Sequence, residues 1–354
     1  MARVVRLLLF LSLTTAALLA QVADPTTAAQ APVAGVGHHY IGIGAETVNP
    51  ASGMLSFDLP VQLPPGRQLS FPFGIRFNGG EAFRIEGKFN GIAWNINPPG
   101  VPNEYGGWSY ELPAYTARDR IQYIYHDLAG TFYCYGTDSY VFYGFDKTQH
   151  NLSQLNSSYG SSSNPNSSRC GAGGNASAND EGTAALLGTV GTIAQPPLTV
   201  TERDGTVYQF PQGPAIDGLA DPSTVVTWGM LAQTITDRNG NRLTLNCSSS
   251  CSGSTTGSAS RALPSGYYTD TLGRRVISWS GIGSSTGDQL TVSGLANNLI
   301  VRWTNVNTTL PGTTYYVSGT APCPLSSSTV SVPSVSEIDL PNGQKYTFTY
   351  GGTW

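Results

Sequence analysis

The stretch ITDRNGNRLTL, Ile235 to Leu245, places an Asn-Gly pair between two short runs of strand-forming residues. Asn-Gly is a strong local signal for a β-hairpin, because it supplies the positive φ values that a two-residue turn requires. Asp237 stands just before the pair, where its carboxylate can accept hydrogen bonds from turn amides. The stretch therefore predicts a hairpin whose turn contains Asp237, Asn239 and Gly240.

Three further stretches have the same layout, and the glycines of the four copies, Gly205, Gly240, Gly273 and Gly343, are separated by 35, 33 and 70 residues. That spacing predicts a repeat of about 35 residues with one degenerate or missing copy. In the first three copies an acid lies three residues before the glycine, and in the fourth Asp339 lies four residues before it. The remaining predicted turn residues are Asp204, Gly205, Asp270, Gly273, Asn342 and Gly343.

Because isolated hairpins are barely stable, such units must pair edge to edge in a larger sheet. Ahead of the repeats, Leu55, Phe57 and Leu59 alternate with polar residues, and the aromatic-rich segments that follow show no helical periodicity. The predicted fold class is all-β, in which antiparallel β-hairpin repeats form an extended twisted sheet preceded by a β-rich N-terminal domain.

Composition divides the chain into five parts. Arg3, Arg6 and the apolar run from Leu7 to Leu19 have the layout of a secretory signal peptide, and the run is shorter than the about 20 residues of a membrane span. We therefore expect a secreted or cell-surface protein with no transmembrane segment in its mature chain. The expected parts are a signal peptide at 1–20, a flexible leader at 21–36, the N-terminal β-rich domain at 37–150, a low-complexity polar loop at 151–188, and the hairpin repeats at 189–354, which end as though a further hairpin should follow.

Charge and cysteine content narrow the choice of partners. Charged residues make up 11% of the chain, against about 25% in ordinary soluble proteins, and the formal net charge is −4. No basic run could displace counterions from phosphates, so nucleic acid is not an expected partner. In an exported chain the five cysteines permit disulfides. Pairing Cys134 with Cys170 and Cys247 with Cys251, which leaves Cys323 over, is one of several arrangements open to them.

The motifs that could carry catalysis or metal binding lack residues that such chemistry needs. Residues 283–287 fit the G-x-S-x-G pattern, but no histidine follows His150 and a strand-forming run comes next. The histidines are scattered, and Asp237, Asn239 and Asn241 have their glycine too early for a calcium loop. No pair of carboxylates stands out for glycan cleavage. We expect no catalytic residues, no cofactor and no metal.

Alternating aromatic residues raise the hypothesis of glycan binding without cleavage. Trp108, Tyr110, Tyr123 and Tyr125 could present their rings on one face of a sheet for stacking against sugars. The alternative, which we favour, is that these rings pack in the core.

Five stretches, taken together in their order along the chain, resemble the RHS or YD-repeat family of exported β-proteins. Three are the repeat copies DRNGNRLTL (237–245), DTLGRRVISW (270–279) and IDLPNGQKYTFTY (338–350), and two are the long segment 48–78 and GGWSYELP at 106–113. The resemblance implies a spiral sheet of hairpins that closes into a hollow shell. Some members use the shell to encapsulate a C-terminal toxin, and others display it at the cell surface or in contacts between cells. The core segment that ends the shell in toxin-bearing members is not found here.

These features predict an exported, non-enzymatic structural scaffold that resembles the N-terminal part of an RHS-repeat cell-surface or toxin-encapsulating protein, and that we interpret as truncated. Its partners would be further RHS repeats or cell-surface glycans. The alternative is a surface adhesin or carbohydrate-binding β module, and a glycoside hydrolase is the third hypothesis. A sheet that ends on an unpaired strand also predicts self-association through that strand.

Overall fold

The fold was analysed in a computed structural model, which describes residues 41–43, 46–48, 55–61, 63, 69, 71–82, 84–88, 91–95, 104–127, 130–145, 148–160, 175–188, 196–213, 225–248, 252–255, 265–284, 286–315 and 323–351. The predicted signal peptide and leader lie outside these residues. The described elements are antiparallel β-strands, apart from a short 3-10 turn at Gly79–Glu81 (η1). The predicted all-β class is therefore confirmed.

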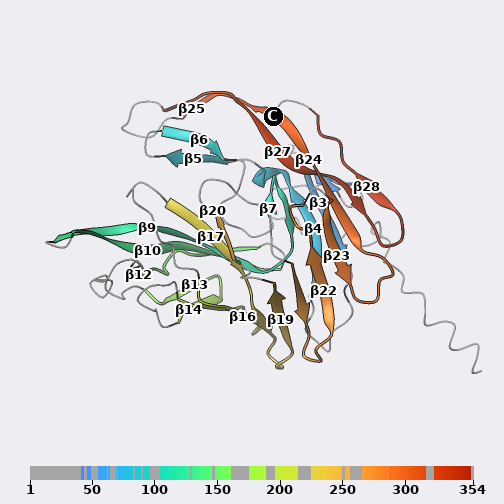
Figure 1. The fold of residues 1–354 in the computed structure, drawn as a ribbon, viewed down its shortest axis with the longest axis horizontal. Helices are drawn as coiled ribbons and strands as arrows, with labels where there is room; N and C mark the ends of the chain where they lie inside the picture. The colour runs from blue at the N-terminus through green and yellow to red at the C-terminus, as the bar shows by residue number, and fades with distance from the viewer. Residues whose placement is uncertain are drawn as a thin grey trace, which may run out of the picture.

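A twelve-stranded antiparallel sheet forms the largest part of the molecule, and its strands follow one another in chain order from green through brown to red (Figure 1). Apolar residues alternate with exposed ones along its strands, so that one face of the sheet is buried. The strands are β13 (Ser177–Asp180), β14 (Thr183–Leu187), β15 (Leu198–Thr201), β16 (Val207–Phe210), β18 (Thr234–Thr236), β19 (Arg242–Cys247), β21 (Gly266–Thr269), β22 (Arg275–Ser280), β23 (Asp288–Val292), β24 (Leu299–Leu310), β27 (Ser328–Asp339) and β28 (Lys345–Thr347).

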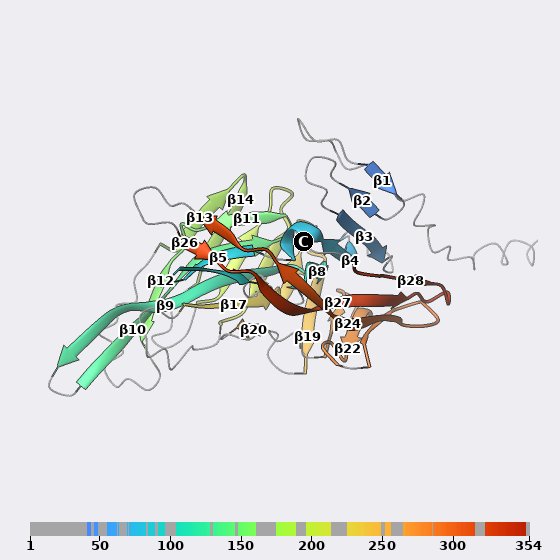
Figure 2. The ribbon, with the colours of Figure 1, turned by 90° about the horizontal axis from the view of Figure 1, so that it is seen from above.

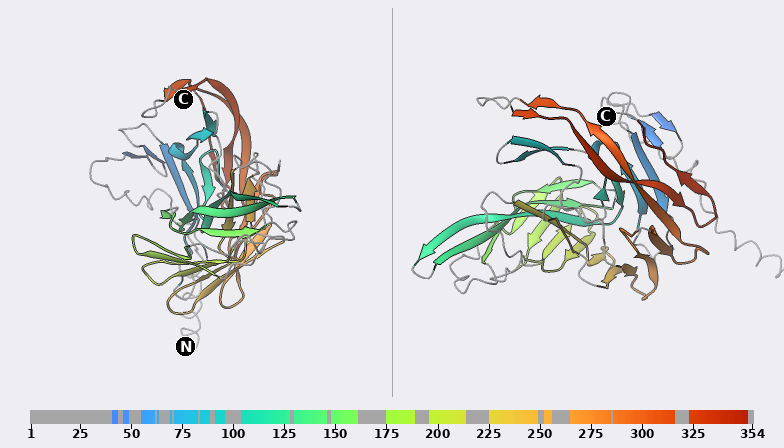
Figure 3. Two further views of the ribbon diagram at one scale, coloured as in Figure 1. Left: turned by 90° about the vertical axis from the view of Figure 1, so that its left-hand side faces the viewer. Right: turned by 45° about the horizontal axis from the view of Figure 1, so that its top comes forward.

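An N-terminal six-stranded sheet has the order β1-β2-β3-β4-β8-β7. The long strands β24 and β27 of the larger sheet arch past its blue strands in Figure 3. The six strands are β1 (Ile41–Ile43), β2 (Glu46–Val48), β3 (Leu55–Val61), β4 (Phe73–Asn78), β8 (Trp108–Tyr110) and β7 (Glu104–Tyr105).

A third sheet is built around a hairpin of two 14-residue strands, β9 and β10, whose far end projects away from the other sheets (Figure 2). It has the order β11-β10-β9-β17-β20, and β12 also pairs with β10. Its strands are β11 (Gln149–Leu152), β10 (Gly130–Tyr143), β9 (Ala114–Asp127), β17 (Val225–Leu231), β20 (Ser252–Thr255) and β12 (Ser157–Gly160), and two small sheets pair β5 (Arg84–Lys88) with β6 (Gly91–Asn95) and β25 (Thr313–Tyr315) with β26 (Cys323–Leu325).

The strand pairing crosses the boundaries expected from composition. The segment 151–188 was expected to be a polar loop, but it contains β12 and also β13 and β14, the first two strands of the twelve-stranded sheet. Although the segment is rich in serine and asparagine, buried and exposed residues alternate along β13 and β14, and Ala178, Ala185 and Leu187 are buried. In addition, β17 and β20 lie in the second half of the chain but extend the sheet of β9. The N-terminal and repeat regions are thus interleaved.

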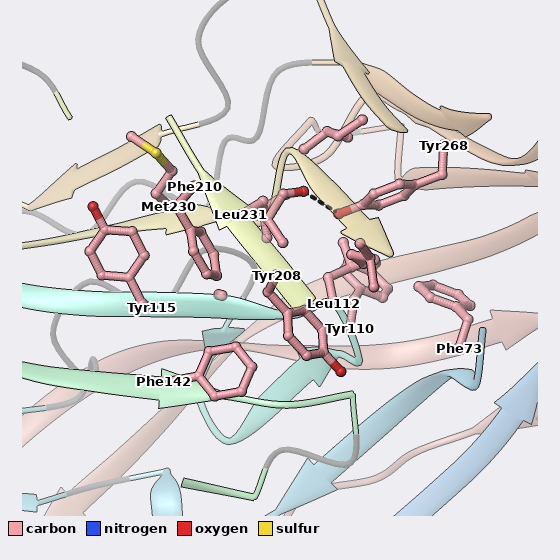
Figure 4. Packing of buried hydrophobic residues seen from close by; sticks show 14 of the residues in the cluster. Phe73, Tyr110, Leu112, Tyr115, Phe142, Tyr208, Phe210, Met230, Leu231 and Tyr268 are labelled. Atoms are coloured by element: carbon pink, nitrogen blue, oxygen red, sulfur yellow. Dashed lines mark hydrogen bonds between the residues drawn. The ribbon is translucent and has the colours of Figure 1, made fainter. Parts of the chain in front are cut away.

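One continuous hydrophobic core joins the three large sheets. Phe57 of β3 packs edge-on against Phe348, with ring centroids 5.1 Å apart, and Tyr115 of β9 does the same against Phe210 of β16 at 4.8 Å. Figure 4 shows the rings of Tyr115, Phe142 and Phe210 lying close together in this core. The buried Tyr268 hydroxyl, also drawn there, donates a hydrogen bond to the backbone oxygen of Ala232 (3.0 Å). Burial of so many rings makes the interface between sheets the main source of stability.

Cys134 and Cys247 both form disulfide bonds. Cys170 and Cys251, their partners in the arrangement considered above, lie outside the described residues. In the part of the chain that the structure describes, no helix has the length and apolar character needed to cross a membrane.

Candidate functional site

The predicted turn glycines have the left-handed backbone that a hairpin turn uses. Their φ angles are +88° at Gly205, +80° at Gly240, +76° at Gly273 and +83° at Gly343. Within the described ranges, the non-glycine residues with positive φ are Ser139 and Glu181. The residue before each turn glycine therefore does not have a positive φ. The expectation of two-residue turns, which need positive φ at both positions, is therefore wrong.

The backbone hydrogen bonds identify these turns as three-residue loops. The amide of Gly240 donates to the carbonyl of Asp237 (3.0 Å), and the amide of Asp237 donates to the carbonyl of Asn241 (3.0 Å). This is a type I turn followed by a bulge at the glycine. The same pair of bonds recurs at the turns that begin at Glu202, Asp270 and Leu340.

The carboxylates of Asp237 and Asp270 accept hydrogen bonds from groups within their own turns. The carboxylate of Asp237 accepts from the amides of Asn239 (2.8 Å) and Asn241 (2.9 Å) and from Nδ2 of Asn241 (2.8 Å). Asp270 accepts equivalent bonds from the amides of Leu272 and Arg274, both at 2.9 Å, and pairs with the Arg274 guanidinium at 2.6 Å. A carboxylate that accepts several donors is held in place and has no proton to give, which suits a structural role better than acid catalysis.

In the first and fourth copies, side chains at other positions accept the hydrogen bonds of the turn. In the first, Asp204 accepts from the amide of Thr206 (2.8 Å), while Glu202 accepts from the hydroxyl of Tyr208 (2.8 Å). In the fourth, Asn342 accepts from the amide of Gln344 (3.0 Å). Asp339 lies outside that turn and pairs with Arg302 at 2.8 Å.

The aromatic residues proposed for glycan stacking divide into two pairs. Trp108 is 2% exposed and Tyr110 is 3% exposed, so neither can offer a ring face to a sugar. The Trp108 ring lies against Phe348 (4.8 Å between centroids), and its Nε1 donates to the hydroxyl of Tyr350 (3.0 Å). For these two residues the glycan hypothesis is wrong, because their face of β8 packs on the large sheet. Tyr123 and Tyr125 lie on β9, and their side chains are outside the described set.

A buried carboxylate, Asp288, joins the N-terminal sheet to the large sheet. Its side chain accepts from the Tyr110 hydroxyl (2.7 Å), from Nε1 of Trp303 (2.8 Å) and from the amide of Gly283 (2.9 Å). These three donors account for the burial of an acid that is 0% exposed. Asp288 directly follows the G-x-S-x-G stretch and is the first residue of β23, whereas a nucleophile elbow needs a helix there.

A second buried polar group lies between β9 and β10, where Asp119 accepts from the hydroxyl of Thr137 (2.6 Å). Burial, together with the nearby Tyr140 and Asp119, raises the pKa of Tyr115, and burial is likewise the main cause of the raised pKa of Tyr140. Both phenols therefore stay protonated at neutral pH, and neither can act there as a general base.

One cavity is a groove of about 850 Å³ lined by residues of β19, β21 and β22. The loop at 211–213 and the end of β17 close its other side. Its lining combines two aromatic residues, several residues with side-chain amides and one arginine, and these residues are Tyr267, Trp279, Gln212, Gln233, Asn246 and Arg275. Its volume falls within the about 300–1,000 Å³ typical of small-molecule sites. We define these residues as the β21 groove.

A smaller cavity of about 240 Å³ lies beside the bulge in β10, where Ser139 has φ +55°. It falls below the usual volume of a ligand site, so the β21 groove is the stronger candidate. Sequence reasoning missed the groove because its lining comes from four separate strands and a loop. The alternation around Tyr267 marks a strand with a solvent-facing ring, but the sequence does not show which rings share a cavity.

No group of three or more His, Cys, Asp or Glu side chains that could hold a metal ion occurs within the described ranges. The comparisons leave the chain without a family assignment: the sequence and structure match no model of a protein family, no curated protein and no solved structure.

Proposed function

We propose that this protein is an exported, non-enzymatic β-scaffold, built like the leading part of an RHS-type repeat protein. The observation that carries the proposal is the single core shared by the N-terminal sheet and the hairpin sheet. The acids most suggestive of chemistry, at the turns and at Asp288, are occupied by donors that hold the backbone in place. Because these acids already accept hydrogen bonds within the sheet, the sheet is better suited to a structural role than to catalysis.

Export is supported by two independent features. The first 20 residues have the layout of a signal peptide. Cys134 and Cys247 are disulfide-bonded, and such bonds persist in oxidising compartments outside the cytosol. Candidate partners are further RHS-type hairpins or glycans at a cell surface.

Export can be tested by producing the full chain with its own N-terminus in a bacterial host. We expect the protein in the periplasm or medium, with its N-terminus near residue 21 and with Cys134 and Cys247 in disulfides by mass spectrometry of unreduced peptides. A chain that stays in the cytosol with its first residues and free thiols would contradict the proposal.

The non-enzymatic role can be tested on the same purified protein with a panel of neutral and acidic polysaccharides. We expect no release of reducing ends above that from the heat-treated protein. Hydrolysis that disappears on a single carboxylate substitution, such as Glu111→Gln, would overturn the scaffold proposal in favour of a glycoside hydrolase.

A further inference from the structure

The β21 groove contains an arginine whose position is fixed by a ring. The guanidinium carbon of Arg275 lies 4.1 Å from the centre of the Tyr267 ring, which is the geometry of a cation–π contact. This stacking holds the guanidinium in place while leaving its N–H edge for a ligand.

Arg275 and its neighbour in sequence, Arg274, differ in their ion pairing. Arg274 pairs with the carboxylate of Asp270 at 2.6 Å. By contrast, no carboxylate is among the described residues that line the groove, and none of them forms an ion pair with Arg275. The groove thus carries a positive charge on a chain whose formal net charge is −4.

The groups around this pair suit the hydroxyls of a sugar. Strand register places Asn246 of β19 and Ser278 of β22 directly beside Tyr267, on the same face of the sheet. Gln212 and Gln233, which are both exposed, also line the groove. Each amide offers both donors and an acceptor, which matches the mixed donor and acceptor character of neighbouring sugar hydroxyls.

The backbone around the groove is closely packed. On the opposite, buried face of the sheet the indole of Trp279 lies against Gly266, where a Cβ would come within 2.7 Å of a ring carbon. The backbone of Gln233 is bonded on both sides, since its amide donates to Gln209 and its carbonyl accepts from Leu245, both at 2.8 Å. A backbone that is already fixed in this way adds little ordering cost when the groove binds a ligand.

We propose that the β21 groove binds an oligosaccharide that carries carboxylate groups, with Arg275 pairing to a carboxylate and Tyr267 positioning Arg275 and contacting the sugar ring. The carboxylate accepts two N–H donors from the planar guanidinium, and the amides bind the hydroxyls of adjoining units. This binding does not depend on the scaffold proposal, because a groove on a rigid sheet can serve an enzyme or an adhesin equally well.

The probe is an octamer of galacturonic acid, titrated by calorimetry into the full mature chain, with maltooctaose as the neutral control. We expect binding of the acidic octamer that weakens as salt is raised, and at least tenfold weaker binding of the neutral one. Arg275→Gln should weaken acidic binding by about tenfold or more, as expected for loss of a hydrogen-bonded charge. Arg274→Gln, one residue away but outside the groove, should bind like the wild type.

Two variants of Tyr267 separate positioning from folding. Tyr267→Phe keeps the ring under Arg275 and should retain most of the affinity, whereas Tyr267→Ala should lose it while the thermal midpoint shows that the chain is folded. No binding of the acidic octamer by the wild type would overturn the proposal. Equal binding of both octamers, or an equal loss in the Arg275 and Arg274 variants, would also overturn it.

Discussion

At the scale of single residues, the hairpin turns show what a local signal can and cannot specify. The sequence places Gly240 at a turn because Asn-Gly is so strongly associated with hairpins. It does not specify the turn type, and the three-residue loop demands a positive φ at the glycine alone. That explains why a leucine, Leu272, can precede Gly273: it occupies the ordinary right-handed position of a type I turn.

The energetic cost of a positive φ at Gly240 can be measured without a steric clash, because no atom lies within 4 Å of a Cβ built there. Gly240→Ala should lower the free energy of unfolding by about 1 kcal/mol, the cost of a left-handed alanine. Gly240→Asn should cost less, since asparagine tolerates this region better. The measurement is urea denaturation. Gly107→Ala is the matched contrast and should cost more, because its Cβ would lie 2.6 Å from the backbone oxygen of Asn78.

The turn acids also predict a pH dependence. Hydrogen bonds from Asn241 lower the pKa of Asp237, and at Asp270 the bonds from Arg274 outweigh burial, so that its pKa is lowered too. A depressed pKa contributes stability above the unfolded value of about 3.9, and this contribution is lost as the pH falls through the folded value. Asp237→Asn with Asp270→Asn should therefore make the fall in unfolding free energy below about pH 4 shallower. Equal slopes for the variant and the wild type in urea titrations would refute this role.

At the scale of elements, the two edges of the twelve-stranded sheet differ. The β13 edge lies beside β11, with Asp180 accepting from the amide of Asn151 (2.8 Å). Within the described residues β28 pairs with β27 alone, and the amide of Phe348 donates to Ser336 (2.9 Å). Since bonding alternates along a strand, the amide of Thr347 points away from β27. The β28 edge is therefore the one that can accept another strand.

We expect the purified chain to self-associate through β28, as the sequence predicts. Thr347→Pro removes the outward amide without breaking a bond to β27, so it should shift the protein toward monomer in sedimentation velocity. Tyr346→Pro is the control for a general proline effect, since it removes an inward amide and should destabilise the sheet instead. A wild type that stays monomeric at high concentration would contradict the expectation.

At the scale of the whole molecule, the sequence predicts the strand content but not how the sheets combine. The ring of Trp108 is covered in part by Phe348, which is 240 residues further along the chain. The serine-rich composition of 151–188 conceals β13 and β14, because two short strands need few apolar residues when they join a large sheet. The same limit applies to the β21 groove, whose Gln212 and Arg275 meet only in the folded chain.

If one core unites the sheets, breaking their polar link should weaken the molecule as a unit. Asp288→Ala leaves the Tyr110 hydroxyl, Nε1 of Trp303 and the Gly283 amide without this acceptor. We expect a loss of about 3 kcal/mol or more in unfolding free energy. Asp339→Ala, which breaks an exposed ion pair with Arg302, should cost about 0–1 kcal/mol. Coincident transitions by tryptophan fluorescence and circular dichroism are expected, and two separate transitions would argue against a single unit.

The contact of Phe57 and Trp108 with Phe348 also sets an order of events during synthesis. A chain that emerges from its N-terminus presents β3 and β8 long before the residues that cover them. Contacts so distant in sequence form slowly, because a long loop must close before they stabilise anything. The apolar face of the N-terminal sheet therefore remains uncovered until the segment that carries Phe348 has been made, and the protein is most prone to aggregation during this interval.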